Sequence, residues 1–282
     1  MNRSKTMTEL TEIKQEAWRY MNRIQSGQNE NALSSFAYDD TFCEAVGVLE
    51  SDPIVHTWVH QPTIVLGTQD TRLQDVFFAK EHLEKAGYTI IVRNSGGLAV
   101  MLDSGVLNIS LIFKDQKSLS IDPTYELMFN LIQQMYSDAP YPIEAKEVVG
   151  SYCPGNYDLS MQGKKFAGIS QRRLRNGTAV QIYLAITGSG SERATTIQQF
   201  YSLAEQTSSE TTMTIEPYTM ASLSELYGQP LTVQDGENRL INTFNMLGKT
   251  LQPKEMSVDE QQRLTKRLKM VYERNDKILY KS

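Results

Sequence analysis

Strand-like and helix-like segments interleave irregularly along this chain, and that order constrains the fold more than any other feature. Alternating or β-branched residues predict strands at 56–60, 63–67, 88–93 and 107–113. Helical spacing of apolar residues predicts helices at 34–47, at 76–86 and from Asp122 onward. An all-parallel wound sheet needs a helix between successive strands, and this order does not provide one. We therefore expect an α/β fold of the α+β type, with mixed β-sheets flanked by helices.

Two local signals sharpen this expectation. Ser34 or Ser35 is the expected N-terminal cap of the helix at 34–47, because a serine hydroxyl accepts from the first free amides of a helix. Asn176-Gly177 stands between two alternating runs, which is a strong signal for a tight β-hairpin.

The chain divides into three parts by composition. The polar residues 1–30 predict an N-terminal arm or a loosely docked helix. Residues 31–230 carry the strands and motifs and are expected to form one catalytic domain. Residues 231–282 include the capping box Ser257-x-x-Glu260 and then an amphipathic pattern, so we expect C-terminal helices packed on the same domain.

Composition excludes several classes of function. Two cysteines and three histidines are too few for a disulfide framework or a typical zinc site, so no metal or other cofactor is expected. The sequence pI of about 5.4 argues against nucleic-acid binding, which favours basic surfaces. No stretch has the roughly 20 apolar residues of a membrane span, and the N-terminus lacks a secretory pattern. We expect a cytoplasmic enzyme or binding protein.

The two cysteines differ in their surroundings. Cys43 falls on the apolar face of a predicted helix and is interpreted as a packing residue. Cys153 lies in Gly-Ser-Tyr-Cys-Pro-Gly, which predicts a loop, and loop positions often carry function. A reactive thiol needs positive charge nearby, and a basic run between Lys164 and Arg175 follows in the sequence. Cys153 is therefore the better nucleophile candidate, although the basic run alone fits a solvated face equally well.

A glycine turn is the second candidate feature. Ser95-Gly96-Gly97 joins two predicted strands, and such a turn lets backbone N–H groups approach a carbonyl or phosphate closely. It matches neither the Walker A pattern nor Gly-x-Gly-x-x-Gly. By spacing alone, a plain turn between strands explains it as well as a binding site does.

Together, these features resemble a known family. Residues 93–100 read R-N-S-G-G-L-A-V, and Asp103 and an L-x-x-S strand at 107–110 follow; G-K-K-F-A-G occupies 163–168. This set is similar to the motifs of the lipoate–protein ligase and octanoyltransferase superfamily. The resemblance implies a biotin/lipoate protein ligase-like catalytic domain.

Within this superfamily, the segments 92–113 and 147–175 resemble the Gram-positive amidotransferase branch. Its members move an octanoyl group from the glycine cleavage H protein to the lipoyl domains of 2-oxoacid dehydrogenase complexes, in lipoate biosynthesis. ATP-dependent ligases usually carry RRxSGGGAVxHD. Here Val92, Leu98 and Leu102 replace the first arginine, the third glycine and the histidine, which argues against adenylate formation. The cysteine at 153 matches the branch that works through an acyl-cysteine.

The resemblance also implies roles for residues. Cys153 would carry the acyl group, and Lys165 would supply positive charge to the thiol and a hydrogen bond to the carbonyl oxygen. The remaining residues would bind substrate: Arg93, Ser95, Gly96, Gly97, Leu98 and Ala99 along the acyl tunnel, with the Leu98 side chain as an apolar wall, and Gly168, Ile169 and Ser170 through backbone N–H groups at the oxyanion. Arg172, Arg173 and Arg175 are candidates for steering acidic carrier proteins. A monomer is expected.

Three alternatives stay open at this point. The first is an ATP-dependent lipoate–protein ligase with the same fold. The second is an octanoyltransferase that uses octanoyl acyl carrier protein as its donor, and the residues do not separate the two donors well. The third is a non-catalytic protein that binds lipoyl domains or senses acyl groups, although such a protein needs neither Cys153 nor Lys165.

Overall fold

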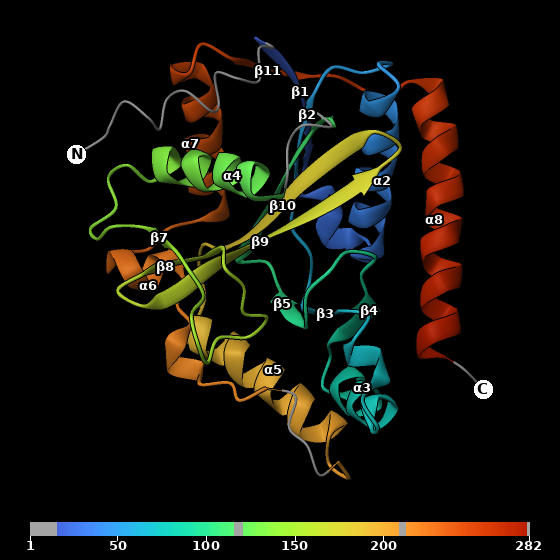
Figure 1. Ribbon diagram of the computed structural model, residues 1–282, viewed down its shortest axis with the longest axis vertical. Helices are drawn as coiled ribbons and strands as arrows, with labels where there is room; N and C mark the ends of the chain where they lie inside the picture. The colour runs from blue at the N-terminus through green and yellow to red at the C-terminus, as the bar shows by residue number, and fades with distance from the viewer. Residues whose placement is uncertain (1–15, 116–120, 209–212, 281–282) are drawn as a thin grey trace.

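The computed structural model describes residues 16–115, 121–208 and 213–280, and within them the strands form two mixed sheets (Figure 1). The large sheet has the order β11-β1-β2-β6-β10-β9-β8-β7. Its strands are β1 (Ala17–Arg23), β2 (Ile54–Trp58), β6 (Val106–Lys114), β7 (Glu144–Ala145), β8 (Asp158–Met161), β9 (Lys164–Leu174), β10 (Gly177–Ala185) and β11 (Thr250–Pro253). The small sheet has the order β4-β3-β5, with β3 (Thr63–Leu66), β4 (Thr89–Val92) and β5 (Val100–Leu102).

Helices cover both faces of the large sheet. Their bounds are α2 (Leu33–Gly47), α3 (Val76–Lys85), α4 (Ile121–Met135), α5 (Gly190–Ala204), α6 (Leu223–Tyr227), α7 (Val233–Met246) and α8 (Val258–Leu279). In Figure 1, α4 and α7 lie on one side of the sheet, and α2 lies on the other with α8 outside it. The small sheet lies beside α3 and α5. The expected α/β fold with mixed sheets flanked by helices is confirmed, as are the strands and helices predicted between 34 and 113.

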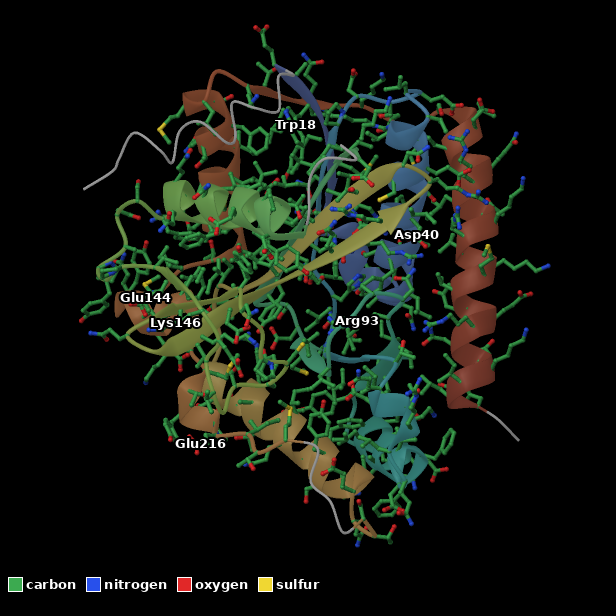
Figure 2. All side chains as sticks on the ribbon, viewed as in Figure 1. Trp18, Asp40, Arg93, Glu144, Lys146 and Glu216 are labelled. Atoms are coloured by element: carbon green, nitrogen blue, oxygen red, sulfur yellow. The ribbon has the colours of Figure 1, made fainter. Side chains whose placement is uncertain are left out.

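The N-terminal segment differs from the expected arm or helix within its described residues. Residues 17–23 form β1, which pairs in parallel with both β2 and β11. Trp18 is fully buried against Phe244 of α7, with their ring centroids 5.6 Å apart (Figure 2). The segment differs from the expectation because one of its two neighbouring strands, β11, comes from residues more than 200 positions away. For the same reason, the strand β11 was not expected among the C-terminal helices.

Two local predictions need adjustment. Neither Ser34 nor Ser35 caps α2, since Ala32 is the cap residue and the Asn31 side chain accepts from the Leu33 amide at 2.9 Å. Both serines lie inside the helix, where they are buried. The hairpin is present but its turn is shifted by one residue: Leu174 pairs with Gly177, so Arg175 and Asn176 form the turn, both with positive φ.

Candidate active site

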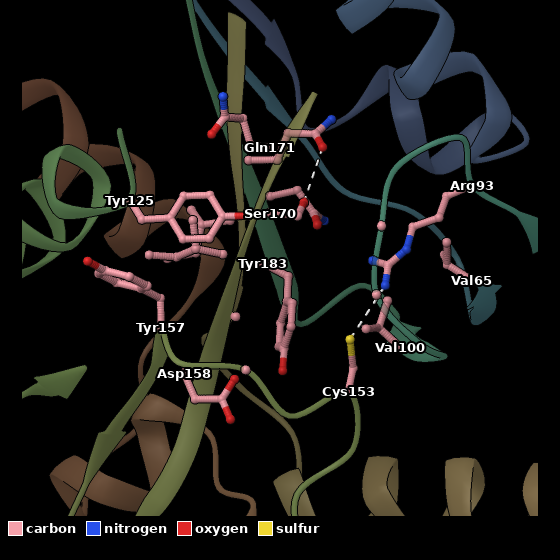
Figure 3. A pocket seen from close by; sticks show the side chains of 18 of the residues that line it. Val65, Arg93, Val100, Tyr125, Cys153, Tyr157, Asp158, Ser170, Gln171 and Tyr183 are labelled. Carbon is pink, nitrogen blue, oxygen red and sulfur yellow. Dashed lines mark hydrogen bonds between the residues drawn. The ribbon is translucent and has the colours of Figure 1, made fainter. Parts of the chain in front are cut away.

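A cavity of about 400 Å³ lies where the two sheets meet (Figure 3). The apolar part of its wall comes from α2, α4, both sheets and the loop before β8. It comprises Phe36, Trp58, Val65, Val100, Leu102, Ile169, Ile182 and the rings of Tyr125, Tyr157 and Tyr183. Asn108, Ser170, Gln171 and Gln181 add polar groups from the large sheet. Such a volume with mostly apolar walls is typical of a site for a small, largely aliphatic ligand.

Cys153 lines this cavity and is half-buried. Its backbone has φ of +46°, a left-handed conformation that is uncommon for a residue with a side chain. The Sγ atom accepts from the Leu98 amide at 3.2 Å, and Nη2 of Arg93 lies 3.5 Å from it (Figure 3). Two donors thus converge on one sulfur atom. Cys43, by contrast, is fully buried on the inner face of α2, which confirms its packing role, and burial raises the pKa of its thiol.

Lys165 lies on β9, outside the cavity lining, and is fully buried. Its ammonium forms an ion pair with Asp158 at 2.8 Å and donates at 2.8 Å each to the carbonyl oxygens of Tyr152 and Cys153. The Ser151 hydroxyl lies at 3.4 Å. Burial raises the pKa of Asp158, and the charge of Lys165 opposes that rise. The structure therefore differs from the expectation in where Nζ points, which is the backbone of the Cys153 turn.

The glycine turn brings Arg93 to the thiol. Gly97 has φ of +99°, and a Cβ added there would overlap the terminal nitrogen of Arg93 and lie 3.0 Å from Sγ of Cys153. Arg93 also donates to the Leu98 carbonyl oxygen at 2.6 Å. A glycine is required at 97 because guanidinium and sulfur occupy the space that any side chain would need. Gly96 also lines the cavity, whereas a Cβ there would meet nothing within 4 Å among the described residues.

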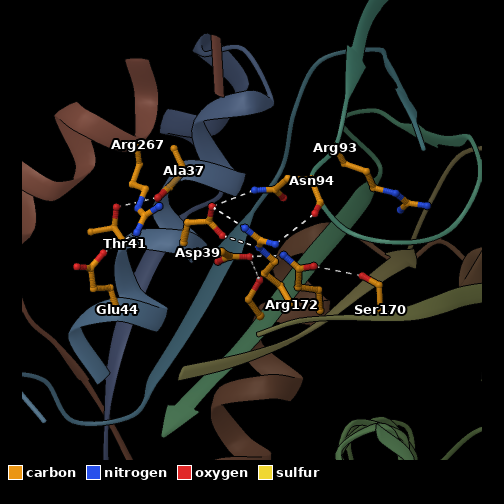
Figure 4. Close-up of polar contacts among 12 residues, drawn as sticks. Ala37, Asp39, Thr41, Glu44, Arg93, Asn94, Ser170, Arg172 and Arg267 are labelled. Carbon is orange, nitrogen blue, oxygen red and sulfur yellow. Dashed lines mark hydrogen bonds and ion pairs between the residues drawn. The ribbon is translucent and has the colours of Figure 1, made fainter. Parts of the chain in front are cut away.

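Buried polar contacts hold this turn from two sides. The Ala99 amide donates to the Tyr201 hydroxyl at 3.2 Å, and that hydroxyl donates to Asp70 at 2.8 Å. On the opposite side, the Asn94 amide group donates to Asp40 at 3.0 Å, and Asp40 also pairs with Arg172 at 2.9 Å (Figure 4). Arg172, expected to steer carrier proteins, is therefore engaged inside the molecule.

Gly168, Ile169 and Ser170 lie on β9 and line the cavity, as expected of substrate-binding residues. A Cβ on Gly168 would lie 2.8 Å from the Tyr183 ring, so this glycine leaves room for the ring. The Ser170 hydroxyl donates to Gln181 at 3.2 Å (Figure 4), and Gln181 donates to the buried Asp39 at 2.6 Å. Their expected role at the oxyanion stays a prediction.

The predicted residues thus fall into two groups. Lining the cavity are Arg93, Gly96, Gly97, Cys153, Gly168, Ile169 and Ser170. Ser95, Leu98, Ala99 and Lys165 are not among the lining residues, and Leu98 contributes its backbone amide to the thiol rather than the expected apolar wall. Sequence reasoning missed Phe36, Trp58, Tyr183 and Asp158. Their signal in the sequence is that of ordinary core residues or of a single acidic residue in a loop.

The family model for the lipoyl protein ligase A/B catalytic domain matches residues 31–245. Curated relatives carry the name octanoyl-[GcvH]:protein N-octanoyltransferase. The relative from Anoxybacillus flavithermus is 47% identical over 276 residues, covering 97% of this chain and 99% of its own length. The relative from Staphylococcus aureus is 46% identical over 268 residues, covering 93% of this chain and 94% of its own.

Solved structures share the fold at low sequence identity. A lipoate-protein ligase A crystallised with ATP has a TM-score of 0.71 and 14% identity, covering 93% of this chain and 98% of its own. A putative lipoate protein ligase from T. acidophilum with bound lipoic acid has a TM-score of 0.70 and 15% identity, covering 94% of this chain and 100% of its own. The solved structures show the fold, and the sequence matches show the family. The chain belongs to the lipoyl protein ligase A/B catalytic domain family, in the group of its octanoyltransferase relatives.

Proposed function

We propose that this protein is an octanoyl amidotransferase that works through a thioester on Cys153. The donor is octanoyl-lysine on the glycine cleavage H protein, and the acceptor is a lysine on the lipoyl domains of 2-oxoacid dehydrogenase complexes. The observation that carries the proposal is the Cys153 thiol at an apolar cavity, with two hydrogen-bond donors on its sulfur. The names of relatives at 46–49% identity support the same donor and reaction.

The reaction proceeds in two matched halves. The Cys153 sulfur attacks the amide carbonyl carbon, a C–S bond forms, and the C–N bond breaks as the donor lysine leaves as an amine. The proton that the thiol gives up is the one that the departing amine gains. The acceptor lysine then attacks the thioester, and the thiol is restored. One amide replaces another, so the chemistry needs no ATP.

The cavity supplies binding energy for the acyl chain. Burying each methylene group contributes about 0.8 kcal/mol, so a fully enclosed octanoyl tail gains about 5 kcal/mol. Phe36 and Trp58 form part of the enclosing wall, with their ring centroids 5.8 Å apart. This energy holds the poorly reactive amide carbonyl against the sulfur while the attack takes place.

Intact mass spectrometry after mixing with octanoylated H protein tests the proposal. We expect an adduct of octanoyl mass that is lost in Cys153→Ala, kept in Cys43→Ala, and discharged when apo lipoyl domain is added. Cys43→Ala is the matched control because that thiol is fully buried. An unmodified enzyme would contradict the proposal, as would attachment of free lipoate only when ATP is present. An adduct formed only from octanoyl acyl carrier protein would replace the donor.

Membrane association, oligomeric state, location and domain boundaries are considered last. None of the described helices combines the length and hydrophobicity that crossing a bilayer requires. The monomeric state, the cytoplasmic location and the domain boundaries at 31 and 230 stay predictions.

A further inference from the structure

Arg93 is a buried cation whose guanidinium lies beside the Cys153 thiol. The residue is 7% exposed, and among the residues that the structure describes no carboxylate forms an ion pair with it. Its hydrogen bonds go to the Leu98 carbonyl oxygen and to Sγ of Cys153. A buried charge is costly unless an opposite charge compensates it. Asp70 interacts with Arg93 without forming an ion pair, whereas the Cys153 sulfur lies 3.5 Å from Nη2.

Lys165 is in the opposite situation. An ammonium group has three protons to donate, and Asp158, Tyr152 and Cys153 accept them, each at 2.8 Å. Asp158 also cancels its charge. No proton of this ammonium group remains for the thiol or for a substrate carbonyl. The lysine instead binds the backbone of the turn that carries Cys153.

We infer that Arg93 is the catalytic cation that stabilises negative charge on the Cys153 sulfur, and that Lys165 is a positioning residue that fixes the turn carrying this cysteine. The Leu98 amide adds the second hydrogen bond to sulfur. The left-handed backbone of Cys153 needs such support, because a residue with a side chain is strained there. This inference rests on the proposed function only in one respect, namely that the Cys153 thiol is the nucleophile.

Other ionisable groups around the pair do not provide this cation. Among the described residues, Asp70 and Tyr125 interact electrostatically with Arg93, and Tyr125, Tyr152, Tyr183 and Tyr201 interact with Cys153. Burial raises the pKa of Asp70 and of each tyrosine, so the four tyrosines stay neutral near pH 7. Asp70 is acidic and is held by the Gly67 amide and the Tyr201 hydroxyl. The neighbouring Arg274 guanidinium donates to the carbonyl oxygens of Val92 and Arg93.

The test measures alkylation of Cys153 by iodoacetamide between pH 5 and pH 10, on full-length protein with Cys43→Ala as the background. Arg93→Gln is expected to slow alkylation at pH 7 by at least about tenfold and to move the midpoint of the pH profile upward, because a hydrogen bond to a charged group is lost. Arg93→Lys keeps the charge without the planar fork, and its midpoint should fall between the two. Identical midpoints in all three proteins would overturn the inference.

Lys165 is tested by removing its charge together with that of Asp158, so that the net charge beside the thiol is preserved. The double variant Lys165→Met/Asp158→Asn should keep the midpoint of alkylation while octanoyl transfer falls, because the turn is no longer held. A midpoint raised as far as in Arg93→Gln would make Lys165 the controlling cation and refute the assignment. If the double variant does not fold, the Arg93 pair decides alone. Alkylation needs no acyl donor. The alkylation result therefore tests the role of Arg93 even if octanoyl transfer, which tests the proposed function, is not observed.

Discussion

Gly97→Ala tests the contact between Arg93 and the thiol without altering either of the two side chains. The new Cβ would overlap the guanidinium nitrogen and lie 3.0 Å from Sγ, where ordinary contact begins at about 3.4 Å. Both atoms are ends of side chains, so they are expected to move apart and the hydrogen bond to break. Such a bond to a charged group is worth about 1.5–3 kcal/mol, which corresponds to about a ten- to hundredfold slower alkylation near neutral pH.

The same substitution also strains the backbone. Alanine at φ of +99° is disfavoured, and a further loss of about 1–3 kcal/mol in the free energy of unfolding is expected. Gly96→Ala is the matched control, because its Cβ would enter open space and its φ lies outside the left-handed region. The assay compares alkylation rates and urea unfolding in the two variants. If Gly97→Ala alkylates as fast as Gly96→Ala, the contact has no part in the reactivity of the thiol.

Three further predictions concern the cavity, pH and the helix α8. Gly168→Ala should raise the KM for the octanoyl donor, or abolish acyl-enzyme formation in a mass spectrum, because its Cβ displaces the Tyr183 ring; an unchanged KM would contradict this. Burial lowers the pKa of His60 to about 4, so the unfolded chain binds this proton first as the pH falls below about 6.5. The contribution of His60 to the free energy of unfolding should therefore be complete above about pH 6.5 and decline by about 3 kcal/mol towards pH 4. In urea unfolding at pH 7 and pH 5, the free energy of unfolding of a His60→Gln variant should decline less than that of the parent protein. Parallel declines in the two proteins would refute this role of His60. Asn275→Ala should lower the free energy of unfolding by about 1–3 kcal/mol, since its side chain pairs with both the amide and the carbonyl of Val92 in β4, and an unchanged urea midpoint would count against that bond.

Features that depend on local sequence patterns could be predicted from the sequence. The Gly- and Pro-flanked position of Cys153 indicated a loop, and the structure places it in a left-handed turn at the cavity. Gly96 and Gly97 were recognisable because a glycine turn between two strands is a local pattern. Strands with β-branched residues, such as β4, were also visible because their neighbours in sequence determine their conformation.

Contacts between distant residues were not visible in this way. Arg93 and Cys153 are 60 positions apart, and only the meeting of the two sheets brings guanidinium and sulfur together. Lys165 was recognised through its motif, but the direction of its ammonium depends on Asp158, whose pairing passes through an irregular register between β8 and β9. The polar segment that forms β1 was predicted to be an arm or a loosely docked helix, because its burial depends on α7 and β11, which lie more than 200 positions away.

The parallel pairing of β1 with β11 also bears on the synthesis of this protein. The ion pair from Arg19 to Glu260, at 2.5 Å, joins residues 241 positions apart. Trp18 finds Phe244 only after α7 has emerged from the ribosome. β1 must therefore wait, unpaired on its outer edge, until residues 250–253 have been synthesised, and such an exposed edge is a site for mispairing. A nascent chain that stops before residue 250 leaves β1 without its outer neighbour β11.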